Sequence, residues 1–153
     1  MIAKAVYVTV VGLPVALIGL VMLEQRLPVG PVVLVLALLP IAGLLFAGRR
    51  LTAAVPDMVF GAIDTGLLVI PALLGGMTFG VAGAIAGGVI GDALTDAIAG
   101  FFEGGISEWL REKGIEESRE PVTSSLGKMA GCLQGAGLVL TLALAAGVRP
   151  GFA

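Results

Sequence analysis

Long apolar runs, separated by short polar or turn-forming segments, make up most of the chain. Each run is about 20 residues, the length that an α-helix needs to cross the hydrocarbon core of a bilayer. Residues that turn or end a helix lie between them, such as Pro28 and Gly30 or the pair Gly75 and Gly76. The pattern predicts an all-α, polytopic integral membrane protein with about five transmembrane helices, at residues 2–23, 31–48, 58–75, 78–102 and 121–147. Four spans, in which the first two runs are re-entrant or one of them is interfacial, remain the alternative.

The segment 103–120, between the fourth and fifth spans, is far more polar than the rest of the chain. Ile106, Trp109 and Leu110 lie at i, i+3 and i+4. The neighbouring charged residues face elsewhere on a helical wheel, namely Glu108, Arg111 and Glu112. This pattern predicts one short interfacial amphipathic helix, which Trp109 anchors in the headgroup region. We therefore expect a cytoplasmic amphipathic loop at 103–120, within a single transmembrane domain that covers residues 1–153.

Glycines recur every four residues in the fourth and fifth spans. A helix turns by about 100° per residue, so glycines at this spacing form a ridge along one face. Ridges of small residues let two helix backbones approach closely in a membrane. We predict glycine-zipper packing by two such ridges, formed by Gly83, Gly87 and Gly91 and by Gly127, Gly131 and Gly135.

The fourth span also carries acidic residues on the side of the helix away from its glycines. Asp92, Asp96 and Glu103 fall within roughly 40° of one another and about 160° from the glycine ridge. Two aspartates at mid-membrane cost about 5–7 kcal/mol on the insertion scale, whereas the large apolar residues of this span return roughly 3–5 kcal/mol. Neighbouring helices are therefore expected to cover the acids.

Three of the predicted spans place charge at a similar depth. At about 1.5 Å per residue, Asp64 lies roughly 9 Å from the start of the third span and Asp96 roughly 9 Å from the end of the fourth. Lys128 lies roughly 10 Å from the start of the fifth. Ionisable residues inside a membrane usually face the bundle interior and mark functional sites. We predict a cation or proton site formed by Asp64, Asp92 and Asp96, with Lys128 as counter-charge and Thr65, Thr95 and Gln134 as supporting polar groups.

The same residues also have a purely structural interpretation. An aspartate paired with Lys128 would be a buried ion pair that fixes helix register, and such a pair by itself implies neither stability nor activity. One lysine cannot neutralise three aspartates, however, so at least one acid must be protonated, solvated in a cavity or bound to a cation. The excess of acid therefore favours a cation or proton site.

Composition supports the membrane class and narrows the ligand. With 58% hydrophobic and 13% charged residues and a mean hydropathy of +1.07, the chain is too apolar for a soluble domain. Carboxylate, hydroxyl and carbonyl oxygens suit a proton or a hard cation such as Mg²⁺, Ca²⁺, Mn²⁺ or Na⁺. The absence of histidine and the single Cys132 argue against zinc or copper, and also against a nucleophile–base pair, so an enzyme is the less favoured class. A net charge of −2 without a basic face argues against nucleic acid.

Basic residues predict the direction in which the chain crosses the bilayer. Lysine and arginine are enriched in cytoplasmic loops. A cytoplasmic N-terminus places most of the basic residues on that side, namely Lys4, Arg49, Arg50, Arg111, Lys113, Arg119 and Lys128, against Arg26 and Arg149 outside. We expect a multi-pass protein of the cell (inner or cytoplasmic) membrane, with its C-terminus outside.

Two short stretches resemble known membrane families. Gly88, Asp92 and Asp96 spell G-x-x-x-D-x-x-x-D, which resembles the second half of the signature of CDP-alcohol phosphotransferases, membrane enzymes that build phospholipids with divalent metal. The first half, D-G-x-x-A-R, is absent upstream, so their metal and nucleotide ligands are not carried over. The run 79–92, FGVAGAIAGGVIGD, is similar to the glycine-rich helix of substrate-capturing components of energy-coupling-factor vitamin transporters, which implies a small polytopic transport subunit.

Three functions are consistent with these features. We favour a cation- or proton-linked transporter, channel or transporter subunit. The alternatives are a non-catalytic scaffold or assembly subunit of a larger membrane complex, and a substrate-capturing component of an energy-coupling-factor-type transporter. The partners expected are the lipid bilayer and either a second copy of the chain or other membrane subunits, because glycine faces on a small protein leave packing surface to fill.

Overall fold

A computed structural model of the 153-residue chain describes residues 1–115 and 120–148. Within these residues the protein is all-helical and contains no strand. The helices are α1 (Ile2–Glu24), α2 (Val29–Leu36), α3 (Leu38–Phe46), α4 (Leu51–Glu112) and α5 (Pro121–Ala145).

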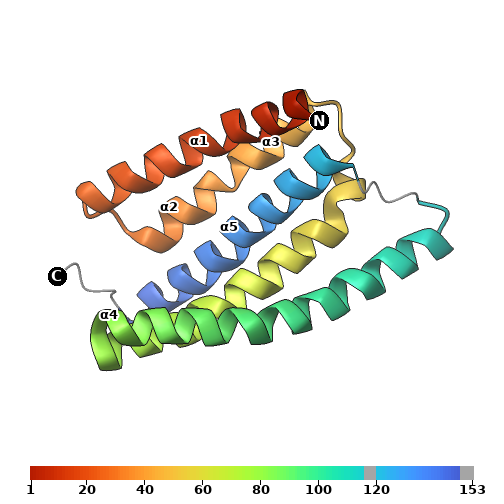
Figure 1. Cartoon of the computed structure of the whole chain (residues 1–153). Coiled ribbons are helices and arrows are strands. Elements are labelled where there is room, and N and C mark those ends of the chain that lie inside the picture. The colour runs from red at the N-terminus through yellow and green to blue at the C-terminus, as the bar shows by residue number, and fades with distance from the viewer. Residues whose placement is uncertain (116–119, 149–153) are drawn as a thin grey trace.

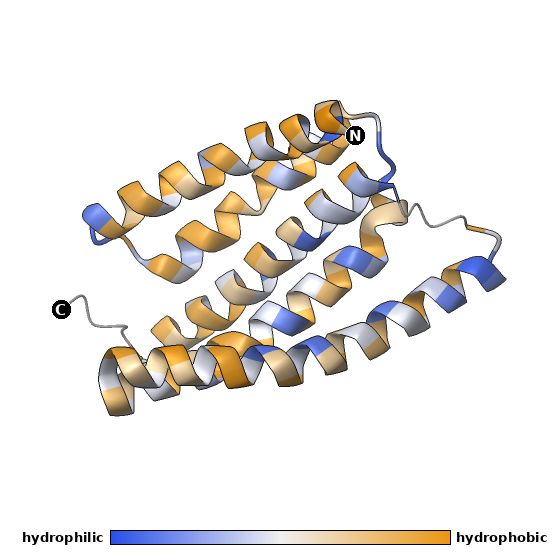
Figure 2. Cartoon of the chain, viewed as in Figure 1, coloured by the Kyte–Doolittle hydropathy of each residue, from blue (hydrophilic) through white to orange (hydrophobic). Residues whose placement is uncertain are grey.

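Four helical stretches in the described residues are long and apolar enough to cross a membrane, which is consistent with the predicted helical membrane protein. These are α1, α2 with α3 as one unit (Val29–Phe46), α4 and α5. Figure 2 shows apolar residues over much of the helical surface, with hydrophilic residues at the ends of the helices and at separate positions along α4 and α5. This distribution is typical of a bundle whose sides contact lipid and whose ends contact water.

Helix α4 is 62 residues long and folds back on itself at Gly80. Gly80 has φ 65° and ψ −149°, a backbone conformation that only glycine adopts readily. A Cβ at this position would meet no other atom, so the backbone conformation is the reason for glycine here, not a lack of space. The first limb (residues 51–79) and the second limb (residues 81–112) then run antiparallel (Figure 1). The predicted hairpin turn at Gly75 and Gly76 therefore lies about one helical turn further along the chain.

The hairpin is tight because small residues face one another across it. A Cβ on Gly83 would meet the carbonyl oxygen of Gly75, and a Cβ on Gly87 would meet that of Pro71. Gly91 lies against the Pro71 ring, where a Cβ would be 2.7 Å from Cγ. A side chain at these positions would push the two limbs apart.

The second predicted span is interrupted at Ala37, between α2 and α3. Pro40 explains this break, because proline has no N–H to donate to the carbonyl of Leu36 and its ring crowds that carbonyl. Pro40 itself is among the most deeply buried side chains. The interruption is short, so α2 and α3 continue along nearly the same path in Figure 1.

Helix α5 lies at the centre of the molecule. It packs against α2 and α3 on one side and against the first limb of α4 on the other, while α1 covers α2, α3 and part of α5 (Figure 1). The second limb of α4 lies at the outer edge of this arrangement. A small core of Leu44, Ala54, Val122 and Leu126 joins α3, α4 and α5 near the end of the bundle where α5 begins.

The second predicted glycine ridge lies on the contact between α5 and the first limb of α4. A Cβ on Gly131 would meet the carbonyl oxygen of Met58, and a Cβ on Gly135 would meet that of Ala62. Gly127 lies over the side chain of Asp57, with 2.9 Å between its notional Cβ and the Asp57 Cβ. These two helices therefore touch backbone to backbone.

The structure extends α4 at both ends beyond the predicted spans. The first limb begins at Leu51, seven residues before the predicted start at residue 58. The second limb continues without a break from Phe102 to Glu112, so the predicted amphipathic helix is the last part of α4 instead of a separate element. Trp109 is 54% exposed there. Residues 116–119 of the predicted loop lie outside the described residues.

Candidate functional site

The buried polar centre of the bundle joins Asp64 on the first limb of α4 to Thr95 on the second. The Thr95 hydroxyl donates a hydrogen bond of 2.6 Å to Oδ1 of Asp64, and the two residues are 5% and 7% exposed. Because α4 begins early, Asp64 lies about 20 Å from its start, not the roughly 9 Å that the predicted span implied. Both residues lie about equally far from the Gly80 turn, so the hairpin brings them to one level.

A second buried carboxylate belongs to Asp57, which was not predicted as a site residue. Pro56 suggested that this part of the chain is a connector before the third span. Asp57 is 5% exposed and accepts a 2.6 Å hydrogen bond from the Ser124 hydroxyl of α5. It precedes Asp64 by seven residues, two helical turns, so the two carboxylates lie on nearly the same side of the first limb. That spacing is the sequence signal that could have identified it.

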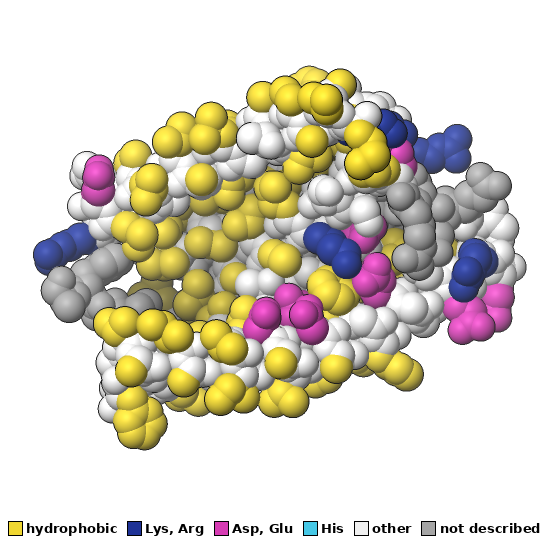
Figure 3. Space-filling model, viewed as in Figure 1, with side chains coloured by type: hydrophobic (Ala, Val, Ile, Leu, Met, Phe, Trp, Pro, Cys, Tyr) yellow, Lys and Arg dark blue, Asp and Glu magenta, His cyan; other side chains and the backbone are white. Residues whose placement is uncertain are grey.

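The other two predicted site residues, Asp92 and Asp96, are exposed on the second limb. Figure 3 shows acidic side chains gathered on this limb at the edge of a hollow with largely apolar walls. The backbone of Asp92 reaches the Asp64 centre, where its carbonyl oxygen accepts a 3.3 Å hydrogen bond from the Thr95 hydroxyl. In residues 1–115 and 120–148, no three acidic or cysteine side chains come close enough together to hold a metal ion.

Lys128 pairs with Glu103, not with the aspartates for which it was predicted as counter-charge. Its Nζ atom is 3.5 Å from Oε2 of Glu103 on the second limb and 3.9 Å from the centre of the Phe60 ring. The side chain is 40% exposed, so this is a partly solvated ion pair with a cation–π contact. Asp57 and Asp64 are therefore left without a basic partner among the described residues.

The three polar residues that were predicted to support the cation site lie at different places in the structure. Thr95 bonds to Asp64, as described above, whereas Thr65 faces α5 beside the Cys132 thiol. Gln134 lines an apolar groove between α5 and the two limbs of α4, together with side chains such as Ile98 and Phe102. The polar centre is thus smaller than predicted and consists of two carboxylate–hydroxyl pairs.

Each carboxylate retains unused hydrogen-bonding capacity. An ionised carboxylate offers about four acceptor positions. Asp57 and Asp64 each receive one side-chain hydrogen bond within the described chain. The remaining oxygen lone pairs can accept a proton, a water molecule or a hard cation, which are the ligands that carboxylate and hydroxyl oxygens suit.

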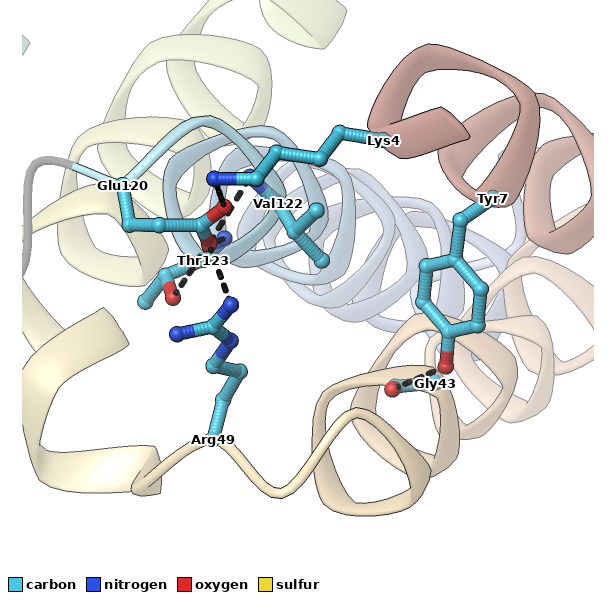
Figure 4. A network of polar contacts seen from close by, with 7 residues as sticks. All are labelled: Lys4, Tyr7, Gly43, Arg49, Glu120, Val122 and Thr123. Carbon is cyan, nitrogen blue, oxygen red and sulfur yellow. Dashed lines mark hydrogen bonds and ion pairs between the residues drawn. The ribbon is translucent and has the colours of Figure 1, made fainter. Parts of the chain in front are cut away.

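A separate ionic cluster lies at the end of the bundle where α1 and α5 begin (Figure 4). Glu120 caps α5 by accepting hydrogen bonds from the backbone N–H groups of Val122 and Thr123, each 3.1 Å long. Lys4 lies 2.8 Å from Oε1 of Glu120, and Arg49 lies 3.4 Å from Oε2. Burial raises the pKa of Glu120, but these hydrogen bonds and the arginine outweigh it and lower the pKa from 4.5 to about 2.

In comparisons with known proteins, no family model, curated protein or solved structure matches the chain.

Proposed function

We propose that this protein is a proton- or cation-linked membrane transport component in which Asp57 and Asp64 are the ionisable groups. The observation that carries the proposal is the burial of two carboxylates on one side of the first limb, each with a single hydroxyl partner and no basic partner in the described chain. Burying a charge in a membrane is expensive, and sites that do so without pairing usually serve ion or proton movement.

The two carboxylates lie along the direction in which an ion would travel. Asp57 is about 9 Å and Asp64 about 20 Å from the start of α4, measured along the helix axis. Their hydroxyl partners come from two different neighbours, Ser124 from α5 and Thr95 from the second limb. A proton or cation that enters at the N-terminal end of α4 would meet Asp57 first and Asp64 one-third of a bilayer deeper.

In this proposal each limb of α4 crosses the bilayer separately, so the chain spans it five times with its N-terminus in the cytoplasm. Two limbs of roughly 30 residues are each long enough to cross about 30 Å of hydrocarbon with tilt. The ends of α1, α3 and α4 that carry Lys4, Arg49 and Arg111 would then share the cytoplasmic side, as the positive-inside rule requires.

Flux through reconstituted liposomes tests the transport proposal. Wild-type protein should dissipate an imposed pH or cation gradient, detected with a trapped pH- or cation-sensitive dye, and Asp64→Asn and Asp57→Asn should each slow it at least tenfold. Glu108→Gln is the matched control, because Glu108 is an exposed acid near the end of α4. Equal flux from wild type and both aspartate variants, or no flux above empty liposomes, would refute the proposal.

Thermal unfolding in detergent separates a cation from a proton. A ligand at 100 times its dissociation constant adds about 2.7 kcal/mol to the stability of the folded state. A cation site predicts that one of Na⁺, Mg²⁺, Ca²⁺ or Mn²⁺ stabilises wild type and not Asp64→Asn. A proton site predicts no ion effect, together with a pH dependence that Asp64→Asn removes.

A second candidate function, an assembly subunit of a membrane complex, is favoured by the exposure of Asp92 and Asp96. Both side chains face outward at mid-helix on a limb whose neighbouring apolar residues are also exposed. Acids at that depth need cover from another helix, which a second copy of the chain or another subunit would supply.

The oligomeric state in mild detergent tests this second function. Ala93→Trp adds bulk next to the acids and should reduce the measured mass to that of a monomer. Leu20→Trp, at an exposed apolar position of α1, is the control and should leave the mass unchanged. A monomeric wild type that binds no other membrane protein would contradict the assembly role.

A further inference from the structure

A polar cavity of about 520 Å³ opens at the end of the bundle where α4 begins. The chain leading into α4 forms one wall, with Arg49, Arg50 and Thr52, while Thr123 of α5 and Gly114 after α4 form the others. A volume of this size is within the range of small-molecule sites. The cavity lies at the basic end of the molecule, and neither Asp57 nor Asp64 is among the residues that line it.

The start of α4 offers unsatisfied hydrogen-bond donors to this cavity. The helix has no side-chain cap at Arg50 and no acidic residue in its first turn, in contrast to α5, which Glu120 caps. Backbone N–H groups at a helix start carry partial positive charge and bind anions readily. The start of α4 therefore has the donors of an anion site without the carboxylate that satisfies them in α5.

The two arginines at the cavity differ in their partners. Arg49 reaches Glu120 with one guanidinium nitrogen, but its Nε atom is buried and has no hydrogen-bond partner among the described residues. Arg50 is exposed and makes no ion pair with the described residues. Lys4 and Arg49 share Glu120 as their acidic partner, which leaves the exposed Arg50 available to a ligand in the cavity.

From these features we propose that the cavity binds a phosphate-bearing anion, with Arg50 and Arg49 on the phosphate oxygens and the first N–H groups of α4 donating to it. Guanidinium groups match phosphate geometry with paired hydrogen bonds, and the Thr52 hydroxyl can add another. The phosphate can come from the headgroup of an anionic lipid or from a soluble phosphate compound. The cavity lies at a bundle end beside apolar helix surface, so it is accessible both to a lipid headgroup and to a soluble phosphate compound.

Binding can be measured with phosphatidylglycerol, phosphatidylcholine and inorganic phosphate as probes. The full-length protein in mixed detergent–lipid micelles should unfold at a higher temperature as phosphatidylglycerol replaces phosphatidylcholine, with half-saturation at least tenfold weaker in Arg50→Gln. Arg26→Gln removes the same charge at the opposite end of the bundle and should bind as wild type does. Arg50→Lys should recover only part of the affinity, because lysine cannot form paired bonds with phosphate.

The probes also separate the two sources of phosphate. Stabilisation by phosphatidylglycerol that inorganic phosphate does not displace assigns the site to a lipid headgroup. Stabilisation by inorganic phosphate in lipid-free detergent, lost in Arg50→Gln, assigns it to a soluble compound. No response of wild type to either probe, or an equal loss in Arg50→Gln and Arg26→Gln, would overturn the proposal.

Discussion

Replacing Thr95 with valine tests whether its bond to Asp64 holds the α4 hairpin together. Valine keeps the volume and branching of threonine, so the change removes the hydroxyl with little effect on packing. The lost bond is 2.6 Å long and joins residues that are 5% and 7% exposed, so Asp64 would remain buried without its only side-chain donor in the described chain. Hydrogen bonds to charged groups contribute about 1.5–3 kcal/mol in soluble proteins, whereas side-chain bonds in a membrane average about 0.6 with a maximum near 1.7. We therefore expect Thr95→Val to lower the free energy of unfolding by about 1–2 kcal/mol.

The measurement is reversible unfolding in mixed micelles as the fraction of dodecyl sulfate rises. Thr78→Val is the matched control, because Thr78 is exposed on the same helix and its hydroxyl bonds only to the Leu74 carbonyl of its own turn. Removing both partners, in Thr95→Val with Asp64→Leu, should cost less than the sum of the single changes, with a coupling energy of about 1 kcal/mol or more. If Thr95→Val costs no more than Thr78→Val, or if the two changes simply add, the bond does not stabilise the hairpin.

Three further predictions concern packing and charge elsewhere in the bundle. Gly87→Ala should lower the free energy of unfolding by about 1–3 kcal/mol, because its methyl group would meet a backbone carbonyl of the first limb. The methyl group of Gly88→Ala would meet no other atom, so this control variant should be neutral or stabilise the protein by up to about 1 kcal/mol. Tyr7→Phe should cost about 0.5–1.5 kcal/mol, since the hydroxyl donates a 2.6 Å bond from α1 to the Gly43 carbonyl of α3. Glu120 has a pKa lowered from 4.5 to about 2, so its carboxylate stabilises the folded state above pH 4.5 and this contribution is lost as pH falls towards 2.

The same unfolding assay checks all three. Equal effects of the two glycine substitutions would mean that the limbs can separate without cost, and an unchanged Tyr7→Phe variant would mean that α1 is held by its apolar contacts alone. For the acid, the difference in stability between wild type and Glu120→Gln should shrink as pH falls from 4.5 towards 2. A constant difference over that range would show that the Glu120 charge does not act on folding.

The helical membrane class could be predicted because it depends on apolar runs and their length. The start of α4 could not be predicted, because Arg49, Arg50 and Pro56 are compatible both with a connector and with the first turns of a helix. Tertiary packing decided between them: Ala53 and Ala54 are buried, which holds the first turn in helical form. This choice moved Asp57 into the bundle and placed Asp64 deeper than its predicted span implied.

The partners of the polar residues were harder to predict than their helices. A helical wheel gives the direction of a side chain but not which neighbour it meets, and this depends on the order of helices around α5. Lys128 was predicted beside the aspartates, but its long flexible side chain reaches Glu103 at the edge of the second limb. Asp64 and Thr95 were both predicted as site residues, and the hairpin geometry brings them into contact.

The turn at Gly80 also has a consequence for how the protein enters the membrane during synthesis. Asp64 finds its partner Thr95 within the same hairpin, 31 residues later, so in the proposed five-span topology both limbs can enter the bilayer as one unit with that carboxylate already bonded. Asp57 must wait for Ser124, 67 residues later, and stays without its hydroxyl partner until α5 has emerged from the ribosome. At typical synthesis rates of about 5–20 residues per second, the two halves of this pair are made several seconds apart, so the Asp57 bond is among the later contacts of the bundle to form.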